Sequence, residues 1–173
     1  MLVAVIYVVL LFPRGSDAFR VSPKRANYYL GWEIPSSQIA ELAKWDLLVL
    51  DMEIQVRSLD ALKKIRALNP DIIMLVYITP QEIKNDASVG FSIMRKKLVA
   101  GIDPMWYLND LNNNKLSFWP GTSLLNVADN SPTVNGLQLN KYIAGFVSKE
   151  LLSTGLWDGV FYDNAWDDIV HFA

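Results

Sequence analysis

The sequence WDLLVLDM, residues 45–52, is an almost unbroken apolar run that ends beside two acids, Asp51 and Glu53. Such runs are typical of strands in parallel sheets, which are buried on both faces. A second run of this kind, DIIMLVYIT, occupies residues 71–79. Between the two, leucine and isoleucine recur at helical spacing over residues 59–68, with Ser58 as the expected N-cap. The order strand, helix, strand predicts a β/α unit in a parallel sheet.

The same pattern continues toward both ends of the chain. ANYYLGW, residues 26–32, is rich in strand-forming residues and precedes a helix that begins near Pro35. WDGVFYD, residues 157–163, follows a helix predicted over residues 139–152 and ended by Gly155. Four such units with right-handed crossovers predict an α/β fold of the parallel (β/α)8 TIM-barrel type.

An open doubly wound sheet is the alternative fold. The segment after the first predicted strand, LGWEIPSS, lacks the glycine-rich phosphate-binding pattern of dinucleotide-binding sheets, so the barrel is favoured. A complete barrel needs about 250 residues, whereas this chain has 173. We therefore interpret residues 19–173 as the N-terminal part of a barrel, truncated to about the first four β/α units, and expect its C-terminal half to be missing from the chain.

The N-terminal segment has the features of a secretory signal peptide. Residues 2–12 are all apolar, and the breakers Pro13 and Gly15 precede a Ser-Asp-Ala sequence suitable for cleavage. This run is too short to span a bilayer, so we expect no stable membrane span. We predict a signal peptide at residues 1–18 and a secreted or extracytoplasmic protein. A buried first strand is the alternative interpretation.

Composition excludes several kinds of chemistry. The net charge of -2, without a basic stripe, argues against a nucleic-acid partner. The absence of cysteine and the single histidine, His171, argue against a metal centre and against a serine triad that does not use His171. We expect neither a metal nor a cofactor. Acid and base chemistry would therefore come from carboxylates.

Acidic and aromatic residues gather where the predicted strands end, and this is the edge at which barrel enzymes carry their active sites. They are Trp32 and Glu33 after the first strand, Asp51 and Glu53 after the second, Tyr77 and Gln81 at the third, and Asp163, Asn164 and Trp166 after the fourth. Carboxylates at these positions could bind sugar hydroxyl groups or could cap a following helix or turn. Aromatic rings such as Trp119 can stack on the apolar faces of sugars.

Several motifs, in order, resemble one family. WDGVFYDN with the preceding YIAGFVSKELLSTG is similar to the fourth-strand region of uncharacterised TIM-barrel glycoside hydrolases, above all hypothetical glycosyl hydrolase family 15. MWYLNDLNNNKLSFWPGTSLLNVAD, residues 105–129, is similar to the insertion of that family after strand three. The resemblance extends from about residue 27 to the end of the chain. In the α-galactosidase and α-amylase groups, the aspartate that ends strand four is the nucleophile, and the resemblance implies this role for Asp163.

The resemblance implies a glycoside hydrolase that acts on an oligo- or polysaccharide, with Asp163 as the catalytic residue. It places the acid/base carboxylate on a later strand, so we expect that partner to be missing and this chain alone to be inactive. Cleavage needs two carboxyl groups, about 5–5.5 Å apart in retaining enzymes and about 6.5–9.5 Å in inverting ones. An inverting pair of Asp51 or Glu53 with Asp163 is a second arrangement.

Two other functions are compatible with parts of this pattern. One is a non-catalytic carbohydrate-binding or scaffold protein of the same fold, in which Trp32, Trp119 and Trp166 stack on sugar and Asp163 only donates or accepts hydrogen bonds. The other is a metal-dependent deacetylase, which the single histidine disfavours.

Overall fold

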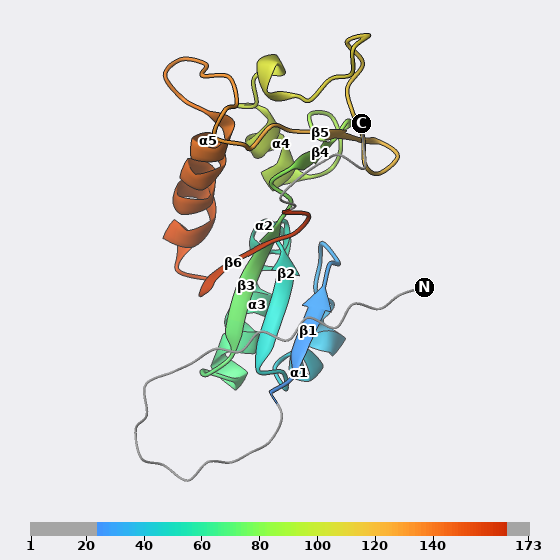
Figure 1. Ribbon diagram of the computed structural model, residues 1–173. Coiled ribbons are helices and arrows are strands. Elements are labelled where there is room, and N and C mark those ends of the chain that lie inside the picture. The colour runs from blue at the N-terminus through green and yellow to red at the C-terminus, as the bar shows by residue number, and fades with distance from the viewer. Residues whose placement is uncertain (1–23, 166–173) are drawn as a thin grey trace.

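A computed structural model describes residues 24–165 of the chain, an α/β structure built on a four-stranded parallel sheet (Figure 1). The sheet has the order β1-β2-β3-β6, with β1 (Ala26–Tyr29), β2 (Leu47–Asp51), β3 (Ile73–Ile78) and β6 (Gly159–Tyr162). All three strand pairs are parallel, so the four strands and their parallel arrangement predicted from the sequence are confirmed. The signal peptide predicted at residues 1–18 and the site residue Trp166 lie outside the described residues.

Helices connect the strands. They are α1 (Ile39–Leu42) after the short turn Ser36–Gln38, α2 (Ile54–Arg57), α3 (Leu59–Leu68), α4 (Ile93–Val99) and α5 (Leu139–Phe146), which continues through Val147–Leu151 and Leu152–Thr154. Gly155 ends the last of these in the left-handed region, at φ 69°, where glycine carries no Cβ penalty. Within residues 24–165, no helix is long and apolar enough to cross a membrane.

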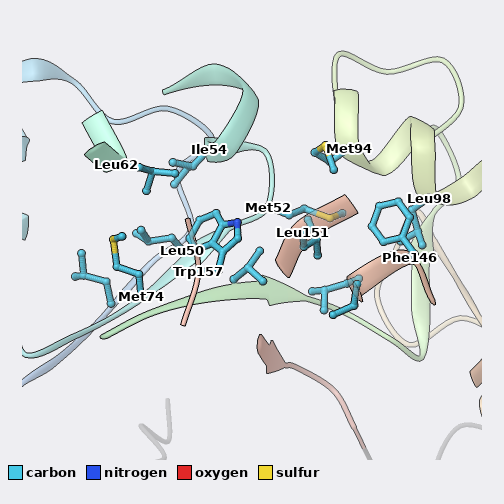
Figure 2. Close-up of a cluster of buried hydrophobic side chains, with 14 of the residues drawn as sticks. Leu50, Met52, Ile54, Leu62, Met74, Met94, Leu98, Phe146, Leu151 and Trp157 are labelled. Carbon is cyan, nitrogen blue, oxygen red and sulfur yellow. The ribbon is translucent and has the colours of Figure 1, made fainter. Parts of the chain in front are cut away.

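The two faces of the parallel sheet are covered to different extents. Alternate residues of β2 and β3, among them Leu48, Leu50 and Met74, are buried in one hydrophobic cluster with helix residues such as Leu62 and Ile143. Figure 2 shows part of this cluster, in which Trp157 lies among side chains that come from strands and from helices. The helices therefore cover this face.

The opposite face carries the remaining side chains of the same strands. The strand register aligns Val49 with Leu75, Asp51 with Tyr77, and Tyr77 with Phe161. Leu75 and Phe161 on this face are only half-buried. We call it the open face, although Val49, Asp51 and Tyr77 on it are also buried. On the helix-covered face, the strand residues of β2 and β3 are all fully buried.

A long insertion separates β3 from α5. It contains α4, a short turn at Pro104–Trp106, and a two-stranded antiparallel sheet of β4 (Glu82–Lys84) and β5 (Thr122–Leu124). Figure 1 shows β4, β5 and α4 beyond one end of the parallel sheet. Because β3 leads into β4 within four residues, the insertion begins at the carboxyl end of β3.

Some local details differ from the sequence prediction. Strand β1 ends at Tyr29, three residues before Trp32, which the predicted strand included. Ser58 precedes α3 but does not cap it, because its hydroxyl oxygen accepts a hydrogen bond from the backbone N–H of Ile34 at 2.9 Å. Leu59 and Leu68, although correctly spaced for a helix, are exposed, since the buried stripe of α3 runs instead through Ala61, Leu62 and Ile65.

Candidate active site

Asp163 follows β6 at the carboxyl end of the sheet, two residues after Phe161, and therefore on the open face. Its backbone N–H donates to the carbonyl oxygen of Ile78 at 3.0 Å, which extends the pairing of β6 with β3 by one residue. The Tyr77 hydroxyl donates to Asp163 Oδ2 at 2.7 Å, and the Tyr28 hydroxyl lies 3.4 Å from the same oxygen. No described residue hydrogen-bonds to Asp163 Oδ1. One carboxylate oxygen is thus held in place, while the other has no partner among residues 24–165.

Three aromatic rings support this carboxylate. The Tyr28 ring meets the rings of Tyr77 and Phe161 edge-on, with centroids 5.6 and 5.5 Å away, and Tyr77 and Phe161 stack at 6.3 Å. Burial, with the charge of Asp163 adding to it, raises the pKa of Tyr28 to about 12. Burial and the hydrogen bond to Asp163 raise the pKa of Tyr77 well above its ordinary value. Both hydroxyl groups therefore remain protonated donors at neutral pH.

Asp51 lies beside Tyr77 in the sheet register but is bound on its other side by Arg95 from α4. Two arginine nitrogens contact its two carboxylate oxygens, Nη1 at 2.9 Å and Nη2 at 2.6 Å, and Asp51 is 2% exposed. A bidentate pair of this geometry is among the stronger charge-assisted interactions. Arg95 therefore balances the negative charge of Asp51. Within residues 24–165, no group of His, Cys, Asp and Glu side chains is placed to hold a metal ion.

Glu53 caps α4. Its Oε2 accepts hydrogen bonds from the backbone N–H groups of Ile93 at 2.7 Å and Met94 at 3.2 Å, and its Oε1 accepts from Arg95 N–H at 3.0 Å. The side chain is fully buried, and the negative charge lies at the positive end of the helix. Glu53 therefore acts as a helix cap, one of the two roles considered above for carboxylates at the strand ends. The helix that it caps begins forty residues further along the chain.

Trp32 is surrounded by cations. The charged groups of Arg95, Lys84 and Arg57 lie 5.0, 5.5 and 5.7 Å from its ring centroid. Arg57 also pairs with the exposed carboxylate of Glu33 at 3.1 Å. Through Arg95 and Arg57, the structure brings Trp32, Glu33, Asp51 and Glu53 into one connected group.

Asn164 connects Asp163 to a second carboxyl group, that of Glu82. Asn164 is in the left-handed region, at φ 53°, and its Nδ2 donates to Glu82 Oε1 at 2.8 Å. Glu82 begins β4 and is 7% exposed, and its Oε2 lies 3.3 Å from Thr122 Oγ1 on β5. Burial, with the charge of Asp163 adding to it, raises the pKa of Glu82.

Thr122 also lines a cavity of about 570 Å³ on the insertion. Polar and basic groups surround the cavity, including Lys84, Lys115 and Ser123, with Tyr107 as an aromatic wall. Trp119, 54% exposed, lies on the loop before β5, where its ring contacts Phe118 edge-on and its carbonyl accepts from Thr122 Oγ1 at 2.8 Å.

The family model of hypothetical glycosyl hydrolase family 15 matches residues 66–172. The chain belongs to this family. The matched region begins within α3 and includes β3, the whole insertion and β6, so it contains Tyr77, Glu82 and Asp163. None of the curated proteins matches the chain.

Membership of hypothetical glycosyl hydrolase family 15 confirms the resemblance seen in the sequence. The structure brings Tyr77 and Asp163 into contact and places Asn164 beside them. Trp32, Glu33, Asp51 and Glu53 form the neighbouring group around Arg95, and Trp119 lies on the insertion. Their roles toward a sugar stay predictions. Sequence reasoning missed Tyr28, Glu82 and Arg95, of which only Glu82 carried a signal, as an acid just after the third predicted strand.

Proposed function

We propose that this chain is part of a glycoside hydrolase that acts on an oligo- or polysaccharide, with Asp163 as its nucleophile. Family membership supports the reaction class. The observation that carries the assignment is the asymmetry of the Asp163 carboxylate, in which Tyr77 holds Oδ2 while no described residue bonds to Oδ1. An oriented carboxylate with one open oxygen is suited to attack on an anomeric carbon.

We further propose that the sheet is part of a (β/α)8 barrel. The strands follow one another in chain order, whereas the order reverses part-way through a doubly wound sheet. Side chains of one face pack with helix residues in the hydrophobic cluster. The open face carries aliphatic and aromatic side chains that suit a barrel interior, with Val49 and Tyr77 buried and Leu75 and Phe161 half-buried. In this arrangement Asp51, Tyr77 and Asp163 lie at the carboxyl-terminal mouth.

In the proposed reaction, Asp163 Oδ1 attacks the anomeric carbon while Tyr77 fixes the carboxylate through Oδ2. Asn164, Trp32, Trp119 and Trp166 contact the sugar. Asp51 and Glu53 act mainly by holding Arg95 and α4, because their carboxylate oxygens are already bonded to these partners. These bonds to the Arg95 guanidinium and to the N-terminus of α4 give both acids a structural role, which disfavours an inverting pair of Asp51 or Glu53 with Asp163.

Replacement of Asp163 by Asn in the full-length protein tests this proposal. The amide keeps the size of the side chain and an oxygen that can accept from Tyr77, but removes the charge. We expect kcat/KM on a panel of aryl glycosides to fall by about 10³-fold or more, with a nearly unchanged melting temperature. Asp71→Asn, at an exposed aspartate between α3 and β3, is the matched control and should keep full activity.

Other results would contradict the proposal in distinct ways. Full activity of the Asp163→Asn variant would show that another residue is the nucleophile. Unfolding of that variant would assign Asp163 a structural role. Sugar binding by the native protein without any hydrolysis would favour the carbohydrate-binding alternative.

A further inference from the structure

Glu82 is a buried carboxyl group without a positive partner among the described residues. Although it is 7% exposed, no lysine, arginine or histidine nitrogen of a described residue lies within 4.0 Å of its oxygens. Asp51, by contrast, is buried to a similar degree and bound by Arg95. A buried carboxylate normally needs a cation or several donors, so an unpaired one favours its neutral, protonated form.

The Glu82 carboxyl group contacts Thr122 and Asn164. The Thr122 hydroxyl has one hydrogen, and its shortest acceptor is the carbonyl of Trp119 at 2.8 Å. The Thr122 hydroxyl also lies 3.3 Å from Glu82 Oε2, and because its single hydrogen can be donated to only one of the two acceptors at a time, Glu82 Oε2 shares this donor with the Trp119 carbonyl. Asn164 Nδ2 donates to the other oxygen, Oε1, which can accept in either protonation state.

The position of Glu82 relates it to the proposed nucleophile. On one side its partner is Asn164, the residue that follows Asp163. On the other side its partner is Thr122, which lines the cavity of about 570 Å³. Cavities of about 300–1,000 Å³ hold small ligands. Thr122 thus links Glu82 to this cavity, whose lining includes neither Glu82 nor Asp163, and in the arrangement proposed below the leaving group of the sugar extends toward it.

We propose that Glu82 is the acid/base residue of this site, an inference that rests on the proposed hydrolase function. Asp163 Oδ1 forms a bond to the anomeric carbon as the glycosidic C–O bond breaks, and the leaving oxygen keeps the electron pair and takes the proton of Glu82. Water then attacks the anomeric carbon, Glu82 takes a proton from that water, and the bond to Asp163 breaks to restore both carboxyl groups. The chain then carries both carboxyl groups of the reaction.

The test compares Glu82→Gln with the unsubstituted full-length protein on phenyl and 2,4-dinitrophenyl glycosides of the common hexoses. A phenolate leaving group needs the proton, whereas dinitrophenolate does not. We expect kcat/KM to fall by about 10²–10⁴-fold for the phenyl glycosides and by less than about tenfold for the dinitrophenyl glycosides. Glu41→Gln, at an exposed glutamate of α1, is the matched control, and its kcat/KM should be unchanged on both kinds of glycoside.

The pH profile gives a second readout. Since the acid must be protonated, native activity falls as pH rises through the raised pKa of Glu82, and this basic limb should disappear in Glu82→Gln. Glu82→Asp keeps a carboxyl group and should keep the limb at a lower rate. If Glu82→Gln is destabilised, this second variant carries the test.

The failure of this inference is distinguishable from failure of the proposed function. A full-length protein that hydrolyses nothing, or a full-length Asp163→Asn variant that stays active, overturns the function. In a second outcome, Asp163→Asn abolishes activity, while Glu82→Gln keeps the native activity on both substrates and the native basic limb. This outcome overturns only the role of Glu82.

Discussion

Tyr77 is the residue on which the geometry of Asp163 depends most. Its hydroxyl is the closer of two donors to Asp163 Oδ2, at 2.7 Å against 3.4 Å for Tyr28, and its side chain is buried at the carboxyl end of β3. A hydrogen bond to a charged group contributes about 1.5–3 kcal/mol, whereas a long contact contributes less. The two tyrosines therefore form a natural pair of test and control.

We expect Tyr77→Phe to lower kcat/KM by about 10–100-fold, because 1.4 kcal/mol corresponds to about a tenfold change in rate. Tyr28→Phe should lower it by less than about fivefold, since it removes only the longer contact and keeps the ring packing. Kinetics of both variants on one aryl glycoside measure the difference. Equal losses, or a larger loss for Tyr28→Phe, would contradict the role given to Tyr77.

The residues of the site were only partly predictable from the sequence. Asp163 and Asp51 stand out because each ends an apolar run, and strand ends are where such sheets carry polar side chains. Tyr28 gave no such signal. It lies 135 residues before Asp163 in the sequence, and the two meet only because β1, β2, β3 and β6 pair side by side in one sheet. Arg95 gave none either, because α4 comes from an insertion whose packing no local pattern reveals.

Among the elements, α4 depends on a distant carboxylate for its N-terminus. Three of its first N–H groups donate to Glu53, and its own N-cap residue, Ser92, makes no side-chain cap hydrogen bond. Removal of Glu53 leaves these donors without their buried acceptor, and it takes from Arg95 the second of its two acids, 3.6 Å away, while Asp51 remains. The helix, the pairing of Arg95 with Asp51 and the position of Trp32 should all weaken together.

We expect Glu53→Ala to lower the free energy of unfolding by about 3–5 kcal/mol, as expected when one partner of a buried charged network is removed. Glu33→Ala, which removes an exposed partner of Arg57, should cost less than about 1 kcal/mol. Urea unfolding followed by circular dichroism compares them. A small cost for Glu53→Ala, similar to that for Glu33→Ala, would show that α4 does not depend on this cap.

The elements themselves were more predictable than their details. The apolar runs in β2 and β3 predict buried strands, because apolar stretches of that length and composition are rarely found in helices or loops. The spacing in α3 predicts a helix but not its orientation, and Leu59 and Leu68 are exposed because the sheet contacts only the stripe through Leu62 and Ile65. Serine is a common N-cap residue, but the Ser58 hydroxyl instead accepts a hydrogen bond from the backbone N–H of Ile34, a contact that the sequence does not reveal.

In the whole molecule, the two faces of the parallel sheet have different roles. One face is buried under helices and holds the hydrophobic cluster, while the open face leads to the carboxyl end where Tyr77 and Asp163 meet. The insertion adds Glu82 and the cavity at that same end. Parallel order and helix content follow from the sequence pattern, but the link between Asp163 and Glu82 arises from the insertion folding back onto the sheet end.

If Asp163 is the nucleophile, it forms a covalent bond to the sugar during the reaction. The most direct measurement is intact-protein and peptide mass spectrometry after incubation with a panel of 2-deoxy-2-fluoro glycosyl fluorides, which slow hydrolysis of the intermediate. We predict the addition of one fluorosugar to the native chain, on the peptide that contains Asp163, and no addition to Asp163→Asn. A fluorosugar on another residue, or hydrolysis of aryl glycosides without any labelled Asp163, would contradict the account.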